Sequence, residues 1–149
     1  MKVIFLDFNG VLDTFDNMDV IDDNNLLRLK RIVEETDSEV VIISSLKNNS
    51  YKEGKYTKNL IKYFIEPLEE IGISIYGITP NKNNREDEIT EFLINHKEID
   101  NFCIIDDEFE YPKYKDKLVK TKYLGNGLED KDVLKAIKIL GIKQKTNKK

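Results

Sequence analysis

The sequence predicts an α/β protein with a doubly wound, mostly parallel sheet of five strands. Short apolar runs rich in β-branched residues recur along the chain, and segments with helical spacing of apolar residues separate them. Strands that alternate with helices form a parallel sheet covered on both faces. The chain has 149 residues and no linker or internal repeat, so we expect one domain over residues 1–142, followed by a basic, flexible tail at 143–149.

Four apolar runs give the expected strands, which cover residues 3–6, 39–43, 73–78 and 102–105. The second run contains four consecutive β-branched residues, a pattern typical of a strand buried on both faces of a parallel sheet. Residues 118–119 would open a short fifth strand.

Segments with apolar residues at helical spacing predict four helices. The first begins near residue 22, and the other three cover residues 59–71, 86–95 and 129–140. Asp22 or Asp23 would cap the first helix, and both assignments stay open. Pro67 would kink the second helix or split it in two. Gly141 stops the last helix, and residues 46–58 read as a polar loop.

Composition and charge exclude several classes of protein. The net charge is −4 with acids and bases interspersed, which does not indicate a general nucleic-acid-binding surface. Cys103 is the single cysteine and lies in an apolar run, so we expect a core residue in a reducing compartment. No apolar segment approaches the roughly 18 residues of a membrane span, and the expected location is cytoplasmic. His96, the single histidine, is expected at the surface rather than in catalysis.

Polar residues follow the expected strands where the carboxyl ends of a parallel sheet meet: Asp7 with Asn9, Ser44 with Ser45, Lys82 with Arg85, and Asp106 with Asp107. We expect these groups to share one crevice. Clustered carboxylates bind Mg²⁺, while hydroxyls and cations bind phosphate oxygens. The pattern therefore indicates phosphoryl transfer.

These motifs resemble the four motifs of the haloacid dehalogenase (HAD) superfamily. Asp7-Phe8-Asn9-Gly10-Val11-Leu12 is similar to the first motif, Asp-x-Asp-Gly-(Val/Thr)-Leu, and Asp106-Asp107 to the fourth. Ser44 or Ser45 matches the second motif, and Arg85 or Lys82 the third. More narrowly, the chain resembles the HAD domain of Swiss Army knife RNA-repair proteins over nearly its whole length.

The resemblance implies a metal site and a nucleophile. Asp7 would become phosphorylated, and Asp106 and Asp107 would hold Mg²⁺ together with Asp7 and the backbone carbonyl of Asn9. Ser44 would hydrogen-bond the transferring phosphoryl group. Either Arg85 or Lys82 would neutralise charge on it.

Asn9 departs from the family pattern, which has an acid/base Asp at this position. An amide can neither protonate the leaving oxygen nor activate water. Three interpretations stay open: an engineered substitution, a natural enzyme that is slow or recruits another group such as Asp13, and a degenerate protein that binds phosphate or nucleic acid without turnover. A response-regulator receiver is rejected, because its acidic pair follows the first strand.

The expected substrate is bulky. The loop at residues 14–21 is too short for a cap domain, so the site should be open to a nucleic-acid end, RNA or DNA, or to a phosphoprotein. Four lysines, including Lys47, and two tyrosines lie within residues 47–58, where they would suit phosphate and base contacts together with Ser44 and Ser45. The sequence does not decide the oligomeric state.

Overall fold

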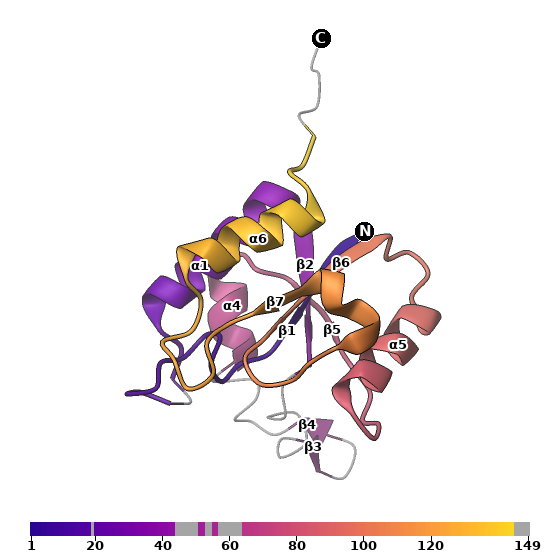
Figure 1. Ribbon diagram of the computed structural model, residues 1–149, viewed down its shortest axis with the longest axis horizontal. Helices are drawn as coiled ribbons and strands as arrows, with labels where there is room; N and C mark the ends of the chain where they lie inside the picture. The colour runs from indigo at the N-terminus through magenta and orange to yellow at the C-terminus, as the bar shows by residue number, and fades with distance from the viewer. Residues whose placement is uncertain (19, 44–50, 53–54, 57–63, 145–149) are drawn as a thin grey trace.

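The fold is a sheet of five parallel strands between two layers of helices (Figure 1). A computed structural model describes residues 1–18, 20–43, 51–52, 55–56 and 64–144. The strand order is β5-β2-β1-β6-β7, and every pairing is parallel. The strands are β1 Lys2–Leu6, β2 Ser38–Ile42, β5 Ile75–Ile78, β6 Asn101–Asp106 and β7 Leu118–Lys120. The predicted fold class is confirmed.

Helices cover both faces of this sheet, as a doubly wound fold requires. The helices of the described ranges are α1 Asp23–Thr36, α4 Glu66–Glu70, α5 Arg85–Asn95 and α6 Asp130–Leu140, with a 3₁₀ turn at Pro112–Lys117. Helices α1 and α6 pack side by side over one face, and α5 lies on the other (Figure 1).

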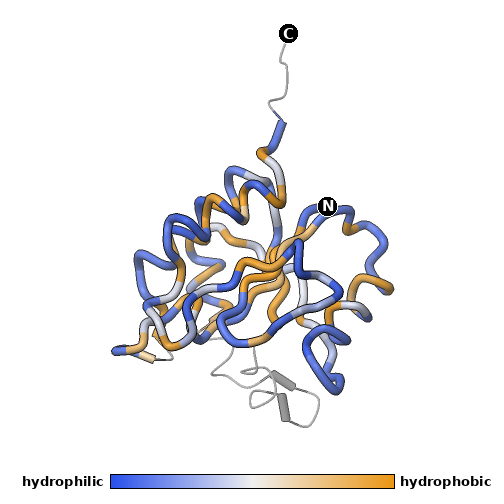
Figure 2. Tube along the Cα trace, viewed as in Figure 1, coloured by the Kyte–Doolittle hydropathy of each residue, from blue (hydrophilic) through white to orange (hydrophobic). Residues whose placement is uncertain are grey.

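The central strand β1 supplies both cores because its side chains alternate between the faces. Ile4 and Leu6 join the larger core under α1, α4 and α6, whereas Val3 and Phe5 join the smaller core under α5. Figure 2 shows the strands as the hydrophobic centre of the molecule. Cys103 lies in the larger core, as expected, and burial raises the pKa of its thiol to about 12.

Side-chain caps fix the starts of the two helices that flank the site. The Asp22 carboxylate accepts a hydrogen bond from the Asn25 amide at 3.1 Å, which identifies Asp22 as the cap of α1. The Asn84 side chain accepts one from the Asp87 amide at 2.8 Å, so α5 begins at Arg85. Gly141, with a φ of 82°, ends α6 as predicted.

Two expected segments are described only in part. Residues 59–63 of the expected second helix lie outside the described residues; residues 64–70 are helical, and Pro67 lies in the first turn of α4, where no amide hydrogen is needed. The expected polar loop at 46–58 contains an antiparallel pair, β3 Tyr51–Lys52 and β4 Lys55–Tyr56.

Within the described ranges no cap domain interrupts the sheet. Those residues also contain no helix with the length and apolar character needed to cross a bilayer.

Candidate active site

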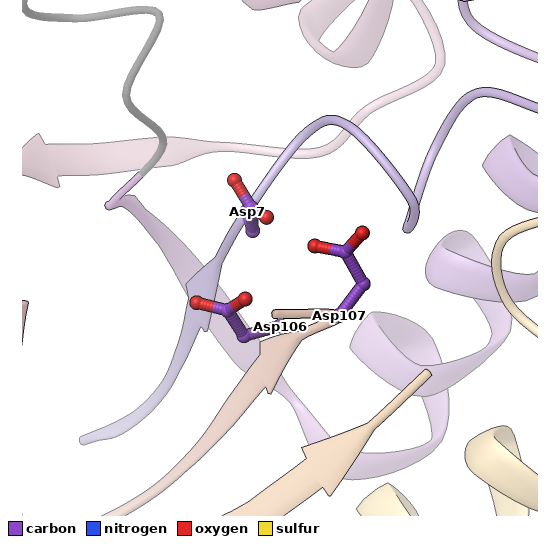
Figure 3. Close-up of side chains that lie close together, drawn as sticks. All are labelled: Asp7, Asp106 and Asp107. Carbon is purple, nitrogen blue, oxygen red and sulfur yellow. The ribbon is translucent and has the colours of Figure 1, made fainter. Parts of the chain in front are cut away.

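Three aspartates meet at the carboxyl ends of two adjacent strands. Asp7 follows β1, Asp106 ends β6, and Asp107 comes next in the chain. Because β1 and β6 pair in parallel with Leu6 opposite Ile105, these side chains reach the same edge (Figure 3). One carboxylate oxygen from each lies within 4.8 Å of the others. All three are buried, with exposed fractions of 4%, 0% and 7% in chain order.

Gly10 lets the loop after β1 pass directly against this cluster. Its φ is +76°, and a Cβ at this position would lie 2.0 Å from Asp107 Oδ2. The Thr121 hydroxyl donates a hydrogen bond to the Gly10 carbonyl at 2.7 Å, which holds the turn from the β7 side. Any larger residue at position 10 would therefore strain the backbone and displace Asp107.

In the part of the chain that the structure describes, Arg85 is the cation that contacts the carboxylates. Its Nη1 lies 2.7 Å from Asp106 Oδ2 and 3.4 Å from Asp7 Oδ1. Lys82, the other candidate for the third motif, forms its ion pair with Glu91 at 2.9 Å instead. The structure thus brings Arg85 to the cluster and directs Lys82 away from it.

Asp106 is surrounded by hydrogen-bond donors. Oδ2 accepts from Arg85 and, at 2.6 Å, from the buried Tyr111 hydroxyl. Oδ1 accepts from the amides of Glu108 at 2.9 Å and Phe109 at 3.4 Å. A carboxylate has about four lone-pair sites, so these four donors use most of its capacity.

Tyr111 and Phe109 were not among the predicted site residues. The Phe109 ring lies 4.7 Å from the Arg85 guanidinium carbon, a cation–π distance. The sequence signal was weak: both aromatics alternate with acids directly after the acidic pair, in a run without helical spacing.

Electrostatics favour a cation in the cluster. Burial raises the pKa of Asp7 to about 7, and the charges of Asp106 and Asp107 add to the rise, while Arg85 opposes it. Burial likewise raises the pKa of Asp107. Among the described residues, the Arg85 guanidinium contacts two of the three carboxylates, and oxygen donors of this kind are what Mg²⁺ prefers. The residues present therefore fit a divalent cation.

The Asn9 side chain is held in place by a carboxylate of the same loop. Its Nδ2 donates to Asp13 Oδ2 at 2.7 Å, and the Gly10 amide donates to Asp13 Oδ1 at 2.7 Å. Asn25, buried on α1, fixes this segment by donating to the Asp13 carbonyl at 3.2 Å and the Asn126 carbonyl at 2.9 Å. No sequence pattern indicated this role of Asn25.

The predicted residues Ser44, Ser45 and Lys47 lie outside the described residues. Ile43, which precedes Ser44, donates its amide hydrogen to the Leu6 carbonyl at 3.1 Å. His96 stacks on Phe92 at the end of α5, with ring centroids 3.9 Å apart, and has no place in the cluster.

Comparison with known proteins agrees with these motifs. A family model described as the HAD domain in Swiss Army Knife RNA repair proteins matches residues 3–133. Neither the curated proteins nor the solved structures contain a match. The matched region includes Asp7, Arg85 and the acidic pair, and it covers most of the sheet. The chain belongs to the family of HAD domains found in Swiss Army Knife RNA repair proteins.

Proposed function

We propose that this protein is a Mg²⁺-dependent phosphohydrolase that acts through an aspartyl-phosphate on Asp7. The observation that carries the proposal is the contact of one half-buried guanidinium, that of Arg85, with Asp7 beside a cluster fit for a cation. HAD domains are typically phosphohydrolases, which supports the same reaction class.

Asp7 and Asp107 would hold the ion, with the backbone carbonyl of Asn9 as a third ligand. Bound Mg²⁺ would neutralise charge on the phosphoryl oxygens. Asp106 adds negative charge to the same cluster, but four donors already use its oxygens. Its main role in this proposal is to anchor Arg85.

The reaction would proceed in two displacements. A carboxylate oxygen of Asp7 attacks phosphorus, the bond from phosphorus to the leaving oxygen breaks, and that oxygen takes up a proton. Water then attacks the aspartyl-phosphate, releasing inorganic phosphate and regenerating the carboxylate. Arg85 would stabilise the charge of the transferring group, and a hydroxyl of Ser44 or Ser45 would hydrogen-bond it. Lys47 remains a proposed substrate contact, whereas Lys82 pairs with Glu91 and takes no part in the reaction.

Proton transfer needs a carboxyl group that Asn9 cannot supply. In this proposal Asp13 supplies it, since its Oδ2 lies 2.7 Å from the Asn9 amide nitrogen. Exchanging these two side chains would keep one amide and one carboxyl in contact and would move the carboxyl to position 9. The same contact favours a second function. An amide fixed in place by Asp13 would suit a protein that binds phosphate or nucleic acid without turnover.

The proposed substrate is a phosphorylated nucleic-acid end. The family's association with RNA repair supports this class. The absence of a cap over the described residues also supports it, because an open site admits a bulky chain.

Phosphate release from 5′- and 3′-phosphorylated oligoribonucleotides, a phosphopeptide and p-nitrophenyl phosphate tests the proposal. The wild type, Asn9→Asp and the exchanged Asn9→Asp/Asp13→Asn variant should be compared, with Asp7→Asn as the inactive control. We expect Mg²⁺-dependent release by the wild type and by the exchanged variant. Phosphate release that survives Asp7→Asn would contradict the mechanism. Silence of the wild type with activity of the exchanged variant would support the binding protein instead.

A further inference from the structure

A cleft of about 460 Å³ adjoins the acidic cluster on the α5 side. Its walls are residues 82–86 and 88 at the start of α5 and residues 108–112 after β6. Arg85 lines the cleft and also contacts Asp7, so the cleft lies next to the carboxylate cluster. The volume falls within the range of small-molecule pockets.

Phe109 offers an aromatic surface in this cleft. The side chain is 42% exposed, although it is a large apolar ring. The Arg85 guanidinium lies over the ring, and the Phe109 amide is held by Asp106 Oδ1 at 3.4 Å. The ring therefore packs against a cation while much of the residue is open to solvent, an arrangement that leaves aromatic surface for a planar group to stack on.

The charged residues that line the cleft favour binding of a nucleobase over binding of a phosphodiester backbone. Four glutamates line it, Glu86, Glu88, Glu108 and Glu110, and its two cations, Arg85 and Lys82, are each already paired with a carboxylate. Three of the glutamates have partners of their own, because Glu86 accepts from the Lys113 amide, Glu88 accepts from the Lys82 amide, and Glu110 pairs with Lys120. Carboxylates repel phosphodiesters, but they accept hydrogen bonds from the exocyclic amino groups of bases. The cleft therefore suits one terminal base better than a continuing backbone.

We propose that this cleft binds the terminal nucleobase of the nucleic-acid end whose phosphate reaches Asp7, with the base stacked on Phe109. The inference rests on the proposed function and adds the recognition of a terminal nucleotide. Arg85 links the two parts of the site, since it borders the cleft and faces the nucleophile.

The binding test uses a fluorescence signal that does not depend on turnover. The chain contains no tryptophan, so Phe109→Trp creates a single reporter in the cleft. Phe15→Trp is the matched control, because Phe15 is also exposed, at 53%, but does not line the cleft. Both are made in the Asp7→Asn background and titrated with a 5′-phosphorylated trinucleotide and with ribose 5-phosphate, which lacks a base.

We expect saturable quenching by the trinucleotide at position 109, little quenching by ribose 5-phosphate, and none at position 15. Calorimetry should give a Kd for the trinucleotide that is about 5- to 150-fold higher in Phe109→Leu than in the protein that keeps Phe109, as loss of base stacking predicts. Equal quenching by both ligands, equal quenching at both positions, or unchanged affinity of Phe109→Leu would overturn the base site.

Acetyl phosphate separates this inference from the proposed function. It has no base, so Phe109→Leu in the active protein should lower kcat/KM for the trinucleotide by a larger factor than kcat/KM for acetyl phosphate. If hydrolysis of both substrates falls equally, Phe109 acts only through Arg85 and the base site is wrong. If the base stacks but no substrate is hydrolysed, the phosphohydrolase proposal alone fails.

Discussion

Replacing Asp7 with Asn should stabilise the metal-free protein, and the gain should grow as the pH rises. Burial raises the pKa of Asp7 from 3.8 to about 7 in the folded protein. A carboxyl with a raised folded-state pKa favours folding when it is protonated, and this contribution is lost as the pH rises from about 4 through about 7. An Asn side chain has no proton to lose, so the variant avoids that loss.

The size of the effect follows from the shift in pKa. A rise from 3.8 to about 7 corresponds to at most about 4 kcal/mol of unfolding free energy at 1.36 kcal/mol per pH unit. Arg85 keeps its contact with Asp106 at 2.7 Å in the variant, so loss of the 3.4 Å contact with Asp7 should offset little of the gain.

Urea unfolding of the wild type and Asp7→Asn from pH 4 to pH 8 in a chelator measures the difference directly. We expect the two proteins to agree within about 1 kcal/mol at pH 4 and to diverge by several kcal/mol at pH 8. Saturating Mg²⁺ should then stabilise the wild type more than the variant; an ion at 100 times its Kd contributes about 2.7 kcal/mol. A stability difference that stays constant with pH, or that favours the wild type in chelator at pH 8, would refute the reasoning.

Three further substitutions test the geometry of the site. Gly10→Ala should weaken Mg²⁺ binding at least tenfold in calorimetry, because its Cβ would meet a carboxylate oxygen of the cluster at 2.0 Å. Gly72→Ala, also at positive φ but with nothing within 4 Å, should cost stability alone; equal Mg²⁺ affinities of the two variants would contradict this. Arg85→Ala should lower phosphate release by at least 100-fold and Lys82→Ala by less than threefold, and the reverse order would show that the cations were wrongly assigned. Tyr111→Phe removes a donor to a buried carboxylate and should cost about 1–3 kcal/mol in urea unfolding, whereas no cost would mean that the hydroxyl is dispensable.

Much of the fold could be predicted because its strands are continuous apolar runs. The five-stranded sheet and the helices on each side of it follow from the alternation of such runs with helical patterns. The antiparallel pair of β3 and β4 was missed, since two-residue strands carry too little periodicity to be distinguished from a polar loop.

The carboxylates of the site could also be predicted, because parallel strands end at one edge. Asp7 and Asp106 meet for this reason, and Asp107 follows directly in the chain. The choice between Lys82 and Arg85 could not be made, because it depends on where α5 begins. Asn84 caps the helix, which places the next residue, Arg85, against the cluster.

The aromatic partners lay beyond what sequence patterns can predict. Tyr111 reaches Asp106 because the chain folds back after β6, and the same bend sets Phe109 against Arg85. Neither contact has a fixed spacing in the sequence, since an irregular segment has no period.

Covalent labelling of Asp7 tests the central claim most directly. The protein would be incubated with acetyl phosphate and Mg²⁺, quenched in acid, and digested, and the peptide that contains Asp7 analysed by mass spectrometry. We predict that this peptide gains one phosphoryl group in the wild type, needs Mg²⁺ for the gain, and stays unmodified in Asp7→Asn. An unmodified peptide in a wild type that releases phosphate, or equal labelling of Asp7→Asn, would contradict the account.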